Sequence, residues 1–223
     1  MTRPPSCLVP SDVSQIAGKK SSDSVEPWLI AIAASAGGIQ AMNIILAALP
    51  ADLPASIVVV EHRTPSKTSS LEQILARSAR VPVETADEHK VIRPCVVYVA
   101  RSDLHLTIAP TREFSYVDGT RVRGVLSSAN PLFESAAAAF KNRMIAVVLT
   151  GSGTDATDGV QRVKAHGGTV IAQDPATAQF FSMPSAAIKT GAVDYVLPVE
   201  AIAPALAAIV RGEIVDDRGR TEA

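Results

Sequence analysis

The chain has 223 residues, of which 47% are hydrophobic and 19% charged, and its net charge of −1 argues against a nucleic-acid binder that relies on bulk charge. The two cysteines, Cys7 and Cys95, are far apart and form neither a disulfide framework nor a zinc-ligand spacing, which favours a reducing compartment. Because no apolar run approaches the roughly 20 residues of a membrane span and residues 1–14 lack a signal-peptide centre, we predict a cytoplasmic protein without membrane insertion.

The first part of the chain predicts a leader followed by alternating strands and helices. Residues 1–26 are rich in Ser, Pro, Lys and Asp without a sustained period, which is typical of a flexible leader. Continuous apolar runs predict buried strands in "WLIAIAAS" and "ASIVVVEH". Helical patterns follow them in "GIQAMNIILAALP" and "SSLEQILARSA".

The middle of the chain has a different pattern. Short segments with β-branched and aromatic residues alternate with turn signals, which predicts hairpins added to the edge or end of the main sheet. These segments are "VPVETA", "CVVYVA", "LHLTIA", "EFSYVDG" and "RVRGVLSS".

Strand and helix alternation then resumes up to a tail at residues 212–223. The predicted helices are "NPLFESAAAAFKN", "TDGVQRVKAHGG", "MPSAAIKTG" and "VEAIAPALAAIVRG", and the predicted strands are "MIAVVLTG" and "TVIAQD". Continuous apolar strands separated by amphipathic helices indicate a parallel sheet covered on both faces. We therefore predict one α/β domain over residues 27–211, with a doubly wound, mostly parallel sheet and an antiparallel hairpin extension.

Three residues with catalytic chemistry stand where predicted strands end. The first strand ends at Ser35, the second at His62, and "MIAVVLTGSGTD" runs into Asp155. Ligands of open parallel sheets bind at the carboxyl ends of the strands. A serine becomes a nucleophile when an imidazole accepts its proton and a carboxylate orients that imidazole. The shared position thus predicts a Ser-His-Asp site.

Structural alternatives exist for each of these residues. Ser35 is also a favoured N-cap for the following helix. His62 could be a hydrogen-bonded strand-end residue, and Asp155 could cap the next helix, with Asp158 competing for its role. His105, inside a predicted strand, is interpreted as a packing residue.

A dinucleotide site is a rival interpretation of the same strand-turn-helix. Glu61, about 20 residues after the glycine pair, occupies the position of a ribose-binding carboxylate. However, "AASAGG" lacks the first two glycines of the G-x-G-x-x-G fingerprint. The common serine hydrolases also match poorly, because their catalytic residues do not follow the chain order Ser, His, Asp. In addition, Ala33 replaces the first glycine of the G-x-S-x-G motif.

A resemblance to a known family favours the serine. "AIAASAGGIQAMNIILAALPADLPASIVVVEHR", "VIRPCVVYVARSDLHLTI", "NPLFESAAAAF", "LTGSGTDATDGV" and "GGTVIAQDPATAQFFSMPSAAIKTGAVDYVLP" together resemble the catalytic domain of the chemotaxis receptor methylesterases, the CheB family, over residues 28–211. The family hydrolyses γ-glutamyl methyl esters on chemoreceptor cytoplasmic helices, and many members deamidate receptor glutamines. By this resemblance Ser35 is the nucleophile, His62 the base and Asp155 the orienting carboxylate.

The chain departs from the family pattern in several places. Residues 1–26 are too few for the usual receiver domain, so we expect a catalytic domain without it. Ala36 stands where Thr is frequent, Ser152 where the family has Met, and Ala156 where it has Gly. The resemblance places the oxyanion near Ala36, Gly37 and Ser152, where backbone N–H groups act whatever the side chains.

The resemblance also sets expectations for partners. It implies a chemoreceptor as substrate and neither a metal nor a cofactor. It also leaves room for a separate response-regulator or chemosensory-kinase partner. The alternative from a different class is a chemosensory binding module that keeps the fold without turnover.

Overall fold

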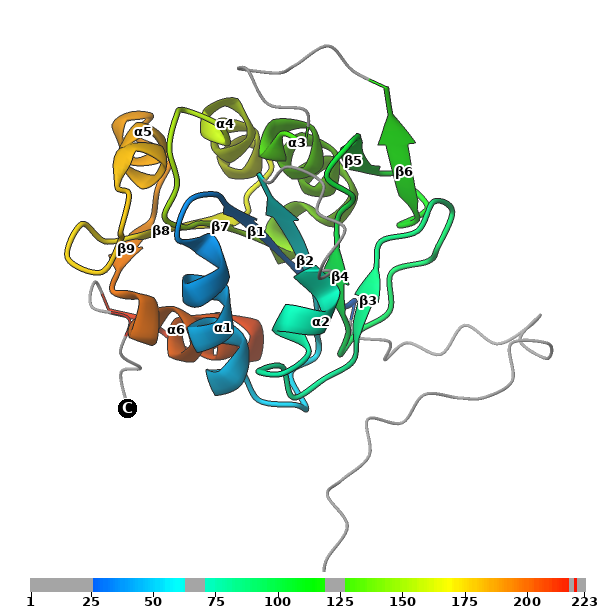
Figure 1. Ribbon diagram of the computed structural model, residues 1–223, viewed down its shortest axis with the longest axis horizontal. Helices are drawn as coiled ribbons and strands as arrows, with labels where there is room; N and C mark the ends of the chain where they lie inside the picture. The colour runs from blue at the N-terminus through cyan, green and yellow to red at the C-terminus, as the bar shows by residue number, and fades with distance from the viewer. Residues whose placement is uncertain (1–25, 63–70, 119–126, 217–218, 220–223) are drawn as a thin grey trace, which may run out of the picture.

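The computed structural model describes residues 26–62, 71–118, 127–216 and 219 (Figure 1). Its centre is a seven-stranded sheet in the order β3-β4-β2-β1-β7-β8-β9, and every neighbouring pair in it is parallel. The strands are β1 (Trp28–Ala34), β2 (Ala55–Glu61), β3 (Val83–Thr85), β4 (Val97–Val99), β7 (Met144–Val148), β8 (Thr169–Gln173) and β9 (Tyr195–Leu197).

Helices cover both faces of this sheet (Figure 1). The helices α1 (Gly38–Ala48), α2 (Leu71–Leu75) and α6 (Val199–Arg211) lie on one face, and α3 (Ala129–Phe140), α4 (Thr157–Ala165) and α5 (Ser182–Lys189) on the other. Strand β1 is buried from both sides: Ile30 and Ile32 pack toward α1 and α6, whereas Leu29 and Ala31 pack toward α3. The predicted doubly wound α/β fold is confirmed.

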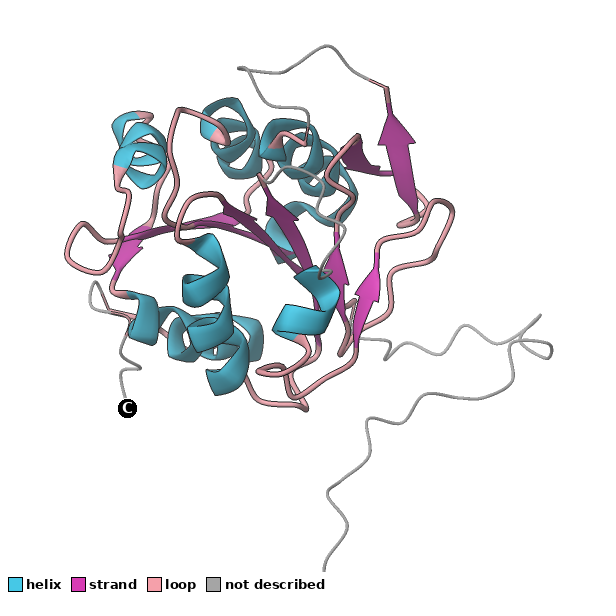
Figure 2. Ribbon diagram, in the orientation of Figure 1, coloured by secondary structure: helices cyan, strands magenta, loops and turns pink. Residues whose placement is uncertain are grey.

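An antiparallel hairpin extends the molecule beside α3. Strands β5 (His105–Ile108) and β6 (Phe114–Val117) pair with each other in a separate two-stranded sheet (Figure 2). Their inward side chains, among them Leu106 and Phe114, join the core under α3. This confirms the predicted hairpin extension for these two segments.

The hairpin prediction is wrong for the two segments before it. Strands β3 and β4 run parallel to each other and to β2, so they widen the main sheet. Short apolar runs do not reveal strand direction, and the connection at residues 86–96 is long enough to return the chain to the start of the sheet. The predicted strand at 121–128 lies mostly outside the described residues, as do nearly all of the leader and much of the tail.

Two further differences concern short elements. In the described ranges helix α2 covers Leu71–Leu75 and ends earlier than predicted, and residues 69 and 70 of the predicted helix lie outside those ranges. Strand β9 was not predicted, because three residues make a weak pattern. A 3₁₀ turn, Lys141–Arg143, precedes β7. Within the described ranges, no helix has the length and apolarity needed to cross a membrane.

Candidate active site

The link between β1 and α1 is a tight turn that presents Ser35. The Gly38 N–H donates to the Ser35 carbonyl at 2.8 Å, and Gly37 has φ 78° and ψ −4°, the geometry of a type II turn. Glycine adopts that conformation without the steric cost that a Cβ atom brings. The N-cap of α1 is Gly37, and no side chain caps the helix, so the capping alternative for Ser35 is wrong. The Ser35 hydroxyl therefore takes no part in capping.

Thr150, just after β7, fixes this turn. Its carbonyl accepts from the Ser35 N–H at 3.1 Å, and its hydroxyl donates to the Ala36 carbonyl at 3.0 Å. The same hydroxyl accepts from the Phe180 N–H at 2.8 Å, and the Thr150 N–H donates to the buried Gln173 side chain at 2.8 Å. One residue thus ties the serine turn to the next two strand-end loops.

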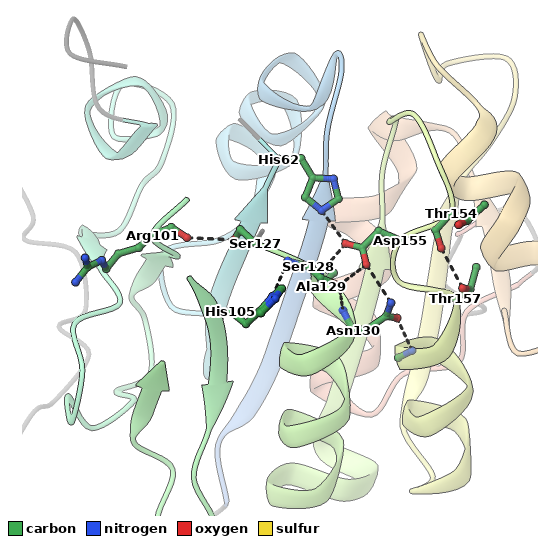
Figure 3. Close-up of polar contacts among 11 residues, drawn as sticks. His62, Arg101, His105, Ser127, Ser128, Ala129, Asn130, Thr154, Asp155 and Thr157 are labelled. Atoms are coloured by element: carbon green, nitrogen blue, oxygen red, sulfur yellow. Dashed lines mark hydrogen bonds and ion pairs between the residues drawn. The ribbon is translucent and has the colours of Figure 1, made fainter. Parts of the chain in front are cut away.

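His62 and Asp155 meet over the carboxyl ends of the strands. His62 Nε2 lies 2.7 Å from Asp155 Oδ2, and the two side chains are 10% and 3% exposed (Figure 3). Because an ionised carboxylate only accepts hydrogen bonds, Nε2 carries the proton and Nδ1 is the basic nitrogen. This contact joins residues 93 positions apart in the chain.

The Asp155 carboxylate is surrounded by donors from the start of α3 (Figure 3). Oδ1 accepts from Ser128 Oγ at 2.5 Å and from Asn130 Nδ2 at 3.0 Å, while Oδ2 also accepts from the Ala129 N–H at 2.7 Å. Burial raises the pKa of Asp155, but its hydrogen bonds with His62, Ala129 and Ser128 outweigh burial and lower the pKa below its usual value. The site holds this carboxylate charged.

Ser35 and His62 line the same cavity, of about 840 Å³, whose other wall is formed by α1. Glu61 and apolar side chains of α1, including Ile39 and Ile44, complete the lining. Among the described residues no hydrogen bond joins Ser35 to His62. Catalytic hydrogen bonds are often long before substrate binds.

The residues expected around the oxyanion lie at two turns. Ala36 and Gly37 line the cavity, and in the described part of the chain their N–H groups donate to no backbone carbonyl. Ser152 is exposed on the loop after β7. That loop is held against α5 because Ser182 Oγ donates to the Gly151 carbonyl and accepts from the Gly153 N–H, both at 3.1 Å.

Ser128 and Asn130 are site residues that sequence reasoning did not single out. Ser128 is the N-cap of α3, and its hydroxyl accepts from the Asn130 N–H at 3.2 Å. Asn130 also accepts from the Gly159 N–H at 2.7 Å, which clamps α3 to α4. A serine just before a predicted helix signals an N-cap, but only the fold shows that this helix end faces Asp155.

Asp158, the competitor for the carboxylate role, and the further histidine His166 lie at the two ends of α4. Asp158 is exposed in the first turn of α4, and His166 follows the last turn, where its Nδ1 lies 2.9 Å from the Arg162 carbonyl. Among the residues that the structure describes, no three His, Cys, Asp or Glu side chains form a group that could hold a metal ion.

Comparison with known proteins places the chain in a family. The family model described as "CheB methylesterase" matches residues 30–206. A Leptospira interrogans relative named "Putative protein-glutamate methylesterase/protein-glutamine glutaminase" is 38% identical over 174 residues, covering 78% of this chain and 90% of the relative. A Thermotoga maritima relative, "Protein-glutamate methylesterase/protein-glutamine glutaminase", is 36% identical over 190 residues, which are 84% of this chain and 55% of the relative.

A solved structure agrees with these sequence matches. The crystal structure of the Thermotoga maritima CheB methylesterase catalytic domain superposes with a TM-score of 0.79 at 35% sequence identity, covering 83% of this chain and 100% of that chain. The fold therefore matches throughout that catalytic domain. The chain belongs to the CheB methylesterase family of enzymes.

Proposed function

We propose that residues 27–211 form a catalytic domain that hydrolyses γ-glutamyl methyl esters on the cytoplasmic helices of chemoreceptors, in the cytoplasm. The observation that carries this proposal is the bond between His62 Nε2 and the buried Asp155 carboxylate, with Ser35 and His62 on one cavity wall. An imidazole held by a carboxylate, the pair that can activate a serine, thus lines the same cavity as Ser35.

The proposed reaction begins with acyl transfer to Ser35. Asp155 keeps the Nε2–H tautomer of His62, so Nδ1 accepts the Ser35 hydroxyl proton while Oγ attacks the ester carbonyl. His62 then returns that proton to the leaving methoxide, and methanol departs. Water attacks the acyl-enzyme with the same base, which releases the glutamate side chain and free Ser35.

The developing oxyanion would be stabilised by the turn itself. The Ala36 and Gly37 N–H groups stand next to the nucleophile, and α1 begins directly afterwards at Gly38. The positive end of the helix dipole adds to these donors. Neither contribution needs a side chain at position 36, so the alanine found there is compatible with turnover.

A second reaction uses the same groups. The relatives are also named protein-glutamine glutaminase, and an amide carbonyl would be attacked as the ester is, with ammonia leaving in place of methanol. The substrate carbonyl belongs to another protein, and the cavity is lined on one side by exposed α1 residues such as Gln40 and Ala47. A receptor helix could therefore approach from solvent.

Methanol release from methylated receptor fragments tests the proposal. We expect Ser35→Ala to abolish release, while Ser185→Ala, a matched change on α5, retains it. Unchanged activity of Ser35→Ala would overturn the nucleophile assignment. A wild-type chain that binds receptor fragments but releases no methanol would instead support the binding module, and tight NAD binding in a thermal-shift screen would support the dinucleotide site.

A further inference from the structure

His105 is a buried histidine outside the proposed triad. It begins β5 and is 2% exposed, and its Nδ1 accepts a hydrogen bond of 3.2 Å from the Ser128 N–H. That N–H belongs to the N-cap residue of α3. The imidazole therefore serves a specific polar contact in addition to packing, which sequence analysis did not anticipate.

Ser128 transmits this contact to Asp155. Its hydroxyl accepts from the Asn130 N–H, so its single proton is free to be donated to Asp155 Oδ1 at 2.5 Å. The other carboxylate oxygen, Oδ2, contacts His62. Figure 3 shows the resulting series of contacts, in which His105, Ser128, Asp155 and His62 follow one another across the top of α3.

A second contact strengthens the link between the hairpin side and the start of α3. Ser127 Oγ donates to the Arg101 carbonyl at 3.1 Å, four residues before His105 (Figure 3). Two consecutive serines thus attach the beginning of α3 to the segment that enters β5. A shift of β5 would move Ser128 and, with it, the carboxylate that orients the base.

We propose that His105 is a positioning residue for the esterase reaction. It fixes the N-cap of α3, so that Ser128 holds the Asp155 carboxylate in the orientation in which Oδ2 contacts His62 Nε2. This inference rests on the proposed function. A carboxylate bound through Oδ1 cannot rotate Oδ2 away from Nε2 without losing a charge-assisted hydrogen bond. Small displacements of catalytic groups cost large factors in rate, so the effect should fall on kcat.

The test compares two replacements of His105 with a neighbour in the same strand. His105→Leu removes the acceptor, and we expect kcat to fall at least about tenfold with KM within about twofold. His105→Asn places an amide oxygen near the Nδ1 position and should recover most of that loss. Leu106→Ala, a fully buried control, should lower the melting temperature without changing kcat.

A double-mutant cycle tests the route through Ser128. In a Ser128→Ala background, which lacks the hydroxyl, His105→Leu should lower kcat by no more than about twofold. Wild-type kcat in His105→Leu would overturn the proposal. If His105→Leu lowered kcat as much in the Ser128→Ala background as in wild type, transmission through the Ser128 hydroxyl would be overturned.

A readout independent of turnover separates this inference from the proposed function. The downfield NMR resonance of the His62 Nε2 proton reports its bond to Asp155. We expect that resonance to broaden or shift in His105→Leu and to persist in Leu106→Ala, even if no methylated receptor fragment is turned over. An unchanged resonance together with unchanged kcat would contradict the positioning role while leaving the esterase proposal intact.

Discussion

Gly151 and Ser35 approach each other too closely for any side chain at position 151. A Cβ atom on Gly151 would lie 2.8 Å from Ser35 Cβ and 3.0 Å from Met183 Sδ. The loop after β7 thus passes directly beside the proposed nucleophile, and its glycine makes that approach sterically possible.

Gly151→Ala should therefore displace Ser35. We expect kcat to fall about 100-fold and the free energy of unfolding to fall by about 1–3 kcal/mol, measured by methanol release and urea denaturation. Gly167→Ala is the control, because its left-handed φ of 81° costs stability while the nearest atom to its new Cβ is 3.7 Å away. Full activity in Gly151→Ala would show that the loop adjusts without moving Ser35.

Ala36→Pro isolates the backbone donor beside the nucleophile. Position 36 is the first central position of the type II turn, where proline is favoured, so the substitution removes the N–H and leaves the turn intact. We expect kcat to fall about 100- to 1,000-fold with an unchanged melting temperature. Ala36→Gly keeps the N–H and should remain active. An active Ala36→Pro would mean that other groups bind the oxyanion.

Asp155→Asn should invert the hydrogen bond to His62. The amide would donate to Nε2, so the proton would move to Nδ1 and the imidazole could no longer accept the Ser35 proton. We expect kcat to fall about 10⁴-fold, as in other triads that lose the carboxylate. Asp158→Asn, on the exposed first turn of α4, should stay active. The reverse ranking of the two variants would assign the carboxylate role to Asp158.

The lowered pKa of Asp155 predicts how stability depends on pH. A carboxyl whose pKa is lower in the folded state stabilises the fold above its unfolded pKa of about 3.9 and loses that contribution as pH falls through the folded value. The difference in free energy of unfolding between wild type and Asp155→Asn should be constant from about pH 7 to 5 and become smaller below about pH 4. Urea denaturation across this range measures it, and a difference that grows toward acid would show that burial dominates.

The sequence predicted the parts of this site that depend on strand ends. Strands β1, β2 and β7 are continuous apolar runs because they are buried on both faces, so their ends, and with them Ser35, His62 and Asp155, could be located. The direction of β3 and β4 could not, since three-residue strands carry no directional pattern.

The support around Asp155 lay beyond sequence reasoning for another reason. Its bonds to Ser128 and Asn130 join residues 27 and 25 positions apart, and they depend on how α3 crosses the sheet. The choice of Nε2 over Nδ1 on His62 depends on the orientation of one ring. Such details follow from packing of whole elements, which a local pattern does not encode.

The central place of β1 gives the site a distinctive cooperativity. Strand β1 ends at the serine turn, and its two neighbours, β2 and β7, lead to His62 and Asp155. Fraying of the edge strands β3 and β9 leaves these three residues together. Loss of pairing among β2, β1 and β7 separates all three at once. Turnover thus reports on the integrity of the central strands, and activity should survive local unfolding of the edge strands β3 and β9.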